Sequence, residues 1–157
     1  MAIRGHQVVD PYTYDLSCSV ASTGEMGGCV VLTTGTFTTG MDNPSKTVSY
    51  ATNPSGRKPM GLLMHDVEDY NTSVVPENFQ RHNLKPLGSK VALVRKFRGR
   101  VNNLHPATTG VITPGADMYV GPLGNYTTLS TSGYPKVGRF ESAVDTDGFC
   151  EIALNID

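Results

Sequence analysis

The sequence has no tryptophan and only three cysteines. Cys18, Cys29 and Cys150 are far apart and form no Cys-x-x-Cys pair, which argues against a zinc ribbon and against a disulfide-dense secreted scaffold. We expect three free thiols in a reducing compartment. No run approaches the roughly 18 apolar residues of a membrane span, and no apolar signal segment follows Arg4. These absences predict synthesis in the cytoplasm and no membrane partner.

Charge of either sign is also scarce. Charged residues make up 17% of the chain, and 13 Lys and Arg nearly cancel 14 Asp and Glu, for a net charge of -1. A typical soluble domain has about a quarter charged residues. A generic polyanion-binding protein has a large positive excess, so this class is excluded.

What the chain does contain favours β-structure. Its 157 residues include 17 Gly, 10 Pro and 17 Thr, a mixture that disfavours helices and suits strands joined by turns. No long helix, internal repeat or second-domain linker is visible. We therefore predict an all-β fold, a small β-barrel or β-sandwich over residues 27–157, preceded by an extended N-terminal arm over residues 1–26. The arm has an alternative, an N-terminal strand packed on its own barrel.

Short apolar or β-branched runs bounded by turn residues mark the expected strands. Residues 59–67 are the most apolar window and predict a buried strand, whereas residues 68–87 predict the longest connection, with one helical turn near 76–79. Asp145-Thr146-Asp147-Gly148 is a strong hairpin signal. The other expected strands are 27–33, 36–38, 47–51, 90–101, 110–113, 118–120, 136–144 and 149–154.

The strand at 90–101 alternates in character. One parity, from Val91 to Val101, is largely apolar, and the other becomes basic. No Asp or Glu occurs between Glu77 and Asp117, yet seven of the 13 Lys and Arg lie in residues 81–100: Arg81, Lys85, Lys90, Arg95, Lys96, Arg98 and Arg100. We consider three interpretations: a solvated edge strand, a surface that docks on an acidic protein, and a nucleic-acid site. Nucleic acid ranks last because no aromatic side chains interleave with these charges.

No catalytic or metal-binding pattern is complete. His65, Asp66 and Glu68 offer metal-binding atoms, but on a strand Asp66 and Glu68 point away from His65. The segment 145–148 starts like a calcium loop and lacks the closing Glu. We therefore predict no enzyme activity, no catalytic residues, no cofactor and no metal. The alternative of a small enzyme or metal-binding barrel would use His65, Asp66, Glu68 or His82.

The order of short elements resembles a known family. The strand at 90–101 is followed by Ile112-Thr113-Pro114-Gly115-Ala116-Asp117-Met118-Tyr119-Val120-Gly121, then by Val137-Gly138-Arg139 and Asp145-Thr146-Asp147-Gly148 before a last apolar strand. Together with Gly28-Cys29-Val30-Val31 and Pro59-Met60-Gly61-Leu62-Leu63, this order resembles the head-decoration, or capsid cement, proteins of tailed bacteriophages. The resemblance covers roughly residues 27–157.

The resemblance implies a structural virion protein with a β-tulip-like body on the outer capsid surface. Its expected partners are the major capsid protein and further copies of itself, with a trimer favoured and a dimer possible. The alternatives are another virion or tail structural β-module and a small nucleic-acid-binding β-barrel. Our candidate partner contacts come from the arm and the basic strand: Ile3, Arg4, Tyr12, Tyr14, Lys90, Lys96, Arg98 and Arg100.

Overall fold

The computed structural model describes residues 3–7, 14–33, 46–69, 84–108, 110–130 and 133–156. These residues form strands, turns and one short 3-10 turn, η3 (Pro122–Gly124), with no α-helix among them. The predicted all-β fold is confirmed. The predicted strand at 36–38 and helical turn at 76–79 lie outside the described residues.

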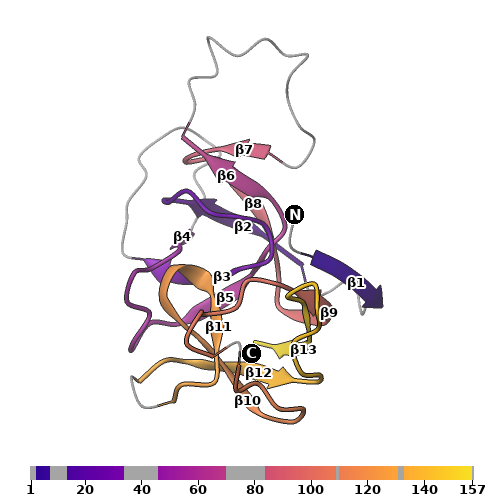
Figure 1. The fold of residues 1–157 in the computed structure, drawn as a ribbon. Helices are drawn as coiled ribbons and strands as arrows, with labels where there is room; N and C mark the ends of the chain where they lie inside the picture. The colour runs from indigo at the N-terminus through magenta and orange to yellow at the C-terminus, as the bar shows by residue number, and fades with distance from the viewer. Residues whose placement is uncertain are drawn as a thin grey trace.

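Five strands close into a barrel in the order β2-β4-β3-β5-β8 (Figure 1). β2 and β4 are parallel, and every other neighbouring pair in the barrel is antiparallel. The strands are β2 (Tyr14–Val20), β3 (Cys29–Thr33), β4 (Lys46–Ser49), β5 (Pro59–Leu63) and β8 (Lys90–Val94). Side chains from all five strands, including Val20, Val30, Val48, Leu63 and Leu93, fill one buried cluster. Closure leaves the barrel with no free strand edge.

A second, antiparallel sheet has six strands in the order β1-β9-β13-β12-β10-β11 and curls without closing (Figure 1). Its strands are β1 (Ile3–Gln7), β9 (Lys96–Val101), β10 (Asp117–Val120), β11 (Tyr126–Thr127), β12 (Lys136–Phe140) and β13 (Cys150–Asn155). A short parallel pair, β6 (Asp66–Glu68) with β7 (Leu84–Pro86), lies at the end of the barrel away from this sheet.

Two features join the barrel to the open sheet. β8 runs into β9 across the single residue Arg95, so one stretch of chain belongs to both sheets, and the amide of Ile156 donates to the Arg95 carbonyl over 2.9 Å. The wall formed by β3 and β5 is buried on both of its faces. Val30 and Leu63 belong to the barrel cluster, whereas Val31 and Leu62 belong to the cluster of the open sheet.

This double burial explains one feature of the sequence. A strand that is covered on both faces has no polar side to show, which is why Pro59–Leu63 lacks alternation and was predicted as buried. The prediction is confirmed for β5. It is also confirmed for the hairpin of β12 and β13, in which Phe140 pairs with Ile152 and the Asp145–Gly148 segment makes the turn.

Two local predictions are wrong. The connection predicted over residues 68–87 contains the strand β7, which pairs with β6, and the strand predicted at residues 110–113 is absent. Residues 110–113 form a turn, in which the amide of Val111 donates to the Thr108 carbonyl over 3.1 Å and the Val111 side chain is 62% exposed. Gly110 and Pro114 bracket this short run. It has no partner strand within the described residues, so its β-branched composition alone does not make a strand.

Two segments of the predicted arm lie in the two sheets. Residues 3–7 form β1, where Ile3 pairs with Val101 and Arg4 with Arg100, and residues 14–20 form β2, where Tyr14 pairs with Val94. This is the arrangement of the alternative, an N-terminal strand packed on its own barrel. Tyr12 lies outside the described residues, and the domain boundary at residue 26 stays a prediction.

Candidate partner-binding surfaces

The basic strand has the predicted alternation. Lys96, Arg98 and Arg100 share the outer face of β9, while Val101 is fully buried and Phe97 packs on the core. Lys90 is exposed at the start of β8. The edge-strand interpretation is wrong, because β9 lies between β1 and β13 and pairs with both. Its charges are therefore carried by an internal strand of the sheet.

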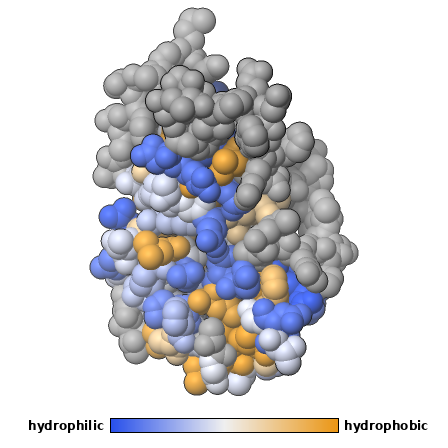
Figure 2. Space-filling view, turned by 45° about the horizontal axis from the view of Figure 1, so that its top comes forward, coloured by the Kyte–Doolittle hydropathy of each residue, from blue (hydrophilic) through white to orange (hydrophobic). Residues whose placement is uncertain are grey.

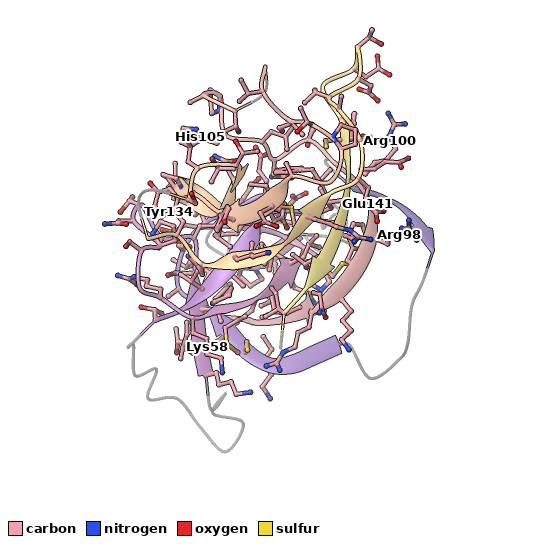
Figure 3. The ribbon with its side chains drawn as sticks, turned by 90° about the horizontal axis from the view of Figure 1, so that it is seen from below. Lys58, Arg98, Arg100, His105, Tyr134 and Glu141 are labelled. Carbon is pink, nitrogen blue, oxygen red and sulfur yellow. The ribbon has the colours of Figure 1, made fainter. Side chains whose placement is uncertain are left out.

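Carboxylates from the C-terminal hairpin face these cations. Arg98 Nε donates to Glu141 Oε2 over 2.6 Å, and Arg139 approaches the other oxygen of Glu141 at 3.4 Å. Arg100 forms an ion pair with Asp145, and its guanidinium lies 5.5 Å from the centre of the Phe149 ring. Figure 3 shows Arg98, Arg100 and Glu141 together at one side of the molecule, away from Tyr134. The positive stretch read along the chain is thus largely neutralised by a segment distant in sequence.

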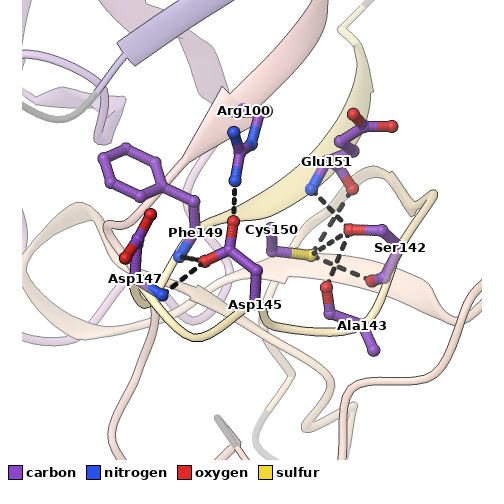
Figure 4. Close-up of polar contacts among 8 residues, drawn as sticks. All are labelled: Arg100, Ser142, Ala143, Asp145, Asp147, Phe149, Cys150 and Glu151. Atoms are coloured by element: carbon purple, nitrogen blue, oxygen red, sulfur yellow. Dashed lines mark hydrogen bonds and ion pairs between the residues drawn. The ribbon is translucent and has the colours of Figure 1, made fainter.

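The turn after β12 holds Asp145 in place for this role. Asp145 Oδ1 accepts hydrogen bonds from the amides of Asp147, at 3.0 Å, and Phe149, at 2.8 Å, while Oδ2 contacts Arg100 (Figure 4). Gly148 has a φ of +80°, a backbone angle that glycine adopts without strain. Both carboxylate oxygens of Asp145 therefore serve the turn and the ion pair.

A partner can contact only the side chains of this surface that remain exposed. The side chains of Arg98 and Arg139 are 62% and 63% exposed although each contacts Glu141, and Lys96 is exposed as well. We call Lys96, Arg98, Arg100 and Arg139 the basic face. Glu141 itself is only 13% exposed, so the arginine side chains, and not this carboxylate, are open to a partner.

A second surface is a groove of about 700 Å³ that the sequence pattern did not reveal. It runs between the turn before β3, the strand β6 and the connection from β10 to β11. We call it the acidic groove; its lining includes Glu25, Tyr50, Asp66, Glu68, Asn103 and Leu123. Glu25 and Glu68 are exposed, and within the described residues none of the three carboxylates takes part in an ion pair.

Backbone pairing brings the distant carboxylates together. Gly24 and Val67 exchange two hydrogen bonds, of 3.0 and 2.8 Å, and the amide of Met26 donates to Asp66 Oδ1 over 2.7 Å. These contacts place the segment that carries Glu25 beside β6. The sequence offered no signal for this approach, since Gly24 and Val67 belong to separate turns and strands.

Tyr50 fixes this part of the groove by packing against three glycines. A Cβ atom added to Gly24, Gly28 or Gly124 would lie 2.2, 2.5 or 2.7 Å from the Tyr50 side chain, distances that a real Cβ does not reach. The Tyr50 amide donates to Ser22 Oγ over 2.8 Å, and its hydroxyl donates to the Glu25 carbonyl. Burial raises the pKa of Tyr50 far above its ordinary value, so the hydroxyl remains a donor.

Leu123 stands at the rim of the groove in an unusual conformation. It has a φ of +57° and is followed by Gly124 at +76°, and the Asn125 amide closes the turn on the Pro122 carbonyl over 3.2 Å. These angles are those of a type I′ turn, whose first central position favours Asn, Asp or Gly. The Leu123 side chain is nevertheless 57% exposed. Figure 2 shows hydrophobic side chains among hydrophilic ones on one face of the molecule.

The predicted alternative of a metal site would use His65, Asp66, Glu68 or His82. His82 lies outside the described residues, and among those described no three His, Cys, Asp or Glu side chains group closely enough to hold a metal ion. Burial, followed by the charge of Lys85, lowers the pKa of His65. Cys29 is buried in the core, where burial raises the pKa of its thiol to about 12.

No protein-family model matches the chain, and a search of curated proteins found no match. In the part of the chain that the structure describes, no helix has the length and apolar character needed to cross a membrane.

Proposed function

We propose that this chain is a structural virion protein that binds the outer surface of an assembled phage capsid and stabilises it by bridging neighbouring major capsid protein subunits. The observation that carries the proposal is the union of two sheets into one body that presents two different surfaces. β8 and β9 are one nearly continuous strand. The wall of β3 and β5 contributes side chains to the cores of both the barrel and the open sheet.

A bridging protein needs such a body. It must hold two contact surfaces at a constant separation. If the surfaces moved relative to each other in the free protein, binding would restrict that motion and cost conformational entropy. The acidic groove is formed by β6 and by turns at residues 23–26 and 122–125, whereas the basic face lies on β9 and β12. Each surface can therefore meet a different subunit of the shell.

The proposed mechanism is multivalent clamping. Once one surface has bound, the second contact becomes intramolecular, so two moderate contacts sum to tight binding. A ligand that binds the assembled shell and not the separated subunits stabilises the shell by mass action. The proposed arrangement has many copies per particle, and further copies of this chain, as a trimer or a dimer, are its neighbours.

The basic face weighs against the nucleic-acid alternative. A phosphate-binding surface gains affinity by neutralising phosphates with free cations and releasing their counterions. Here Arg98 and Arg100 already contact Glu141 and Asp145. A gel shift that weakens steeply with salt would support the nucleic-acid alternative over ours.

Co-sedimentation tests the proposal. The purified chain is incubated with its assembled shell and, separately, with unassembled shell protein. We expect stoichiometric binding to the assembled shell alone, and decorated shells that break at a higher temperature than bare ones. Equal breaking temperatures, or no binding to the assembled shell, would reject the cement role.

A further inference from the structure

Besides the acidic groove, the molecule has a hollow on the open sheet. Its volume is about 710 Å³, it is bounded by β10, β12 and β13, and it adjoins the basic face through Arg139. We call it the sheet hollow; its lining includes Asp117, Lys136, Gly138, Arg139, Ala153 and Asn155. Small residues and cations therefore meet in one concave part of the surface.

Strand register places an arginine on each side of a small residue. Arg139 on β12 pairs with Ala153 on β13, and Ala153 pairs in turn with Arg98 on β9. The three residues form one row across neighbouring strands, so the two arginine Cα atoms lie about 10 Å apart. Ala153 has no side chain beyond Cβ, which leaves room between the two long side chains for part of a ligand.

Glu141 holds both guanidinium groups in place. One of its oxygens accepts from Arg98 Nε over 2.6 Å and the other from Arg139 Nη2 over 3.4 Å, while Glu141 itself is only 13% exposed. The two Nη atoms of Arg98, and the Nε and Nη1 atoms of Arg139, donate to no described residue. These outward N–H groups belong to side chains that are already ordered, so binding an anion costs them less conformational entropy.

The charge around the hollow is positive, although the net charge of the chain is -1. Lys136 and Asp117 cancel each other in an ion pair of 2.7 Å. Arg98 and Arg139 share the one negative charge of Glu141, and Lys96, which pairs in register with Asn155, has no ion pair among the described residues. Two positive charges are therefore left over, one from the arginines and one from Lys96.

This excess is confined to one end of the basic face. At the other end Arg100 contacts Asp145 and lies opposite Glu151 in the strand register. A long polyanion gains affinity from many free cations in a track, which this surface does not offer among its described residues. Two excess charges beside a hollow suit a short segment with two negative charges.

We propose that the sheet hollow binds an extended acidic segment of a partner protein, whose two carboxylates, separated by one residue, contact Arg98 and Arg139 on either side of Ala153. Side chains two residues apart in an extended chain project to the same side, about 7 Å from each other. This spacing suits two arginines that converge on Glu141 from Cα atoms about 10 Å apart. The inference rests on the proposed function only in naming the shell protein as the source of the segment.

A titration of the full chain tests the hollow directly. The probe is the capped peptide Ser-Glu-Thr-Glu-Ser, added to isotope-labelled protein, with Ser-Lys-Thr-Lys-Ser as the charge-reversed control. We expect saturable amide shifts at Arg98, Arg139 and Ala153 with the acidic peptide alone. Raising the salt from about 0.05 M to about 0.5 M shortens the screening length about threefold and is expected to weaken binding about fivefold.

Two matched pairs of variants assign the contacts. Arg98→Gln should weaken binding of the acidic peptide about fivefold, whereas Arg57→Gln, at an exposed arginine on another turn, should not. Ala153→Gln keeps every charge and fills the room between the arginines, so it should also lose affinity. Ala107→Gln, at an exposed alanine outside the hollow, should bind normally. If Ala153→Gln does not fold, the arginine pair decides.

Three results would overturn the inference. The first is equal affinity of Arg98→Gln and Arg57→Gln, and the second is equal binding of the acidic and basic peptides. The third is tighter binding of a short oligothymidine with shifts at the same amides, which would assign the hollow to nucleic acid.

Co-sedimentation separates this inference from the proposed function. If the wild-type chain and the Arg98→Gln/Arg139→Gln variant bind the assembled shell equally, the shell is not the source of the segment and the cement role stands. If the acidic peptide binds in the hollow but the wild-type chain does not bind the shell, the proposed function fails and the hollow remains a site for an acidic segment of another partner.

Discussion

The basic face and the acidic groove carry opposite charge. They also differ in how clearly the sequence shows them and in whether their charges form ion pairs. The basic face is conspicuous along the chain, with seven cations in residues 81–100, yet Arg98 and Arg100 form ion pairs with Glu141 and Asp145. The acidic groove is inconspicuous along the chain, because Glu25 and Asp66 are far apart, yet its carboxylates have no ion-pair partner among the described residues. Charge density along a chain is therefore a poor guide to the charge that a partner meets.

The largest effect should come from breaking the scaffold of the groove. In Gly124→Ala the new Cβ would lie 2.7 Å from the Tyr50 ring and 3.0 Å from the Cys29 carbonyl oxygen, at a residue whose φ is +76°. Overpacking and the left-handed backbone should together lower the free energy of unfolding by about 3 kcal/mol. Chemical denaturation measures this loss. Gly110→Ala, where a Cβ meets nothing within 4 Å, is the control and should be close to neutral.

A smaller effect should come from the turn that neutralises the basic face. Asp145→Ala removes two hydrogen bonds to backbone amides and the ion pair with Arg100, which should cost about 2 kcal/mol of unfolding free energy. Asp147→Ala changes an exposed carboxylate in the same turn and should cost far less. Similar losses for the two variants would show that Asp145 does not organise this turn.

Charge reversal within the basic face sharpens the comparison further. Arg100→Glu places a carboxylate beside Asp145 and should lower stability by about 1 kcal/mol, whereas Lys96→Glu, at an exposed residue with no ion pair within the described residues, should leave stability unchanged. Under the proposed function both variants should weaken binding to the shell. Thermal unfolding separates the two effects, and a stability loss in Lys96→Glu would show that its charge is also used inside the fold.

The smallest effect concerns pH. Burial lowers the pKa of His65 in the folded protein, so the unfolded chain takes up its proton first as the pH falls. The stability associated with neutral His65 is full above the ordinary histidine pKa of 6.5 and is lost as the pH falls below it toward the lower folded pKa. Denaturation midpoints at pH 7.5 and pH 5 measure this loss. His65→Gln should reduce the difference between the two midpoints, and an unchanged difference would assign the pH dependence to other groups.

Local chemistry allowed the main elements to be predicted. The Asp-Gly turn identified the β12–β13 hairpin, the alternation at 90–101 identified the outward face of β9, and the apolar window at residues 59–67 identified the buried strand β5. Each of these signals depends on neighbours in the chain. The same kind of signal failed at residues 110–113, because a strand also requires a partner.

The sequence by itself determined the all-β class, the Asp-Gly turn of the β12–β13 hairpin and which side chains of β9 point outward, because residue preferences and the period of two act over a few residues. Only the tertiary structure decided that β9 is an internal strand, that Glu141 and Asp145 face its arginines, and that Glu25 and Asp66 line one groove with Tyr50. These facts depend on which strands pair and how the two sheets share a wall. Pairing is decided by the packing of the whole chain, and no local pattern contains it.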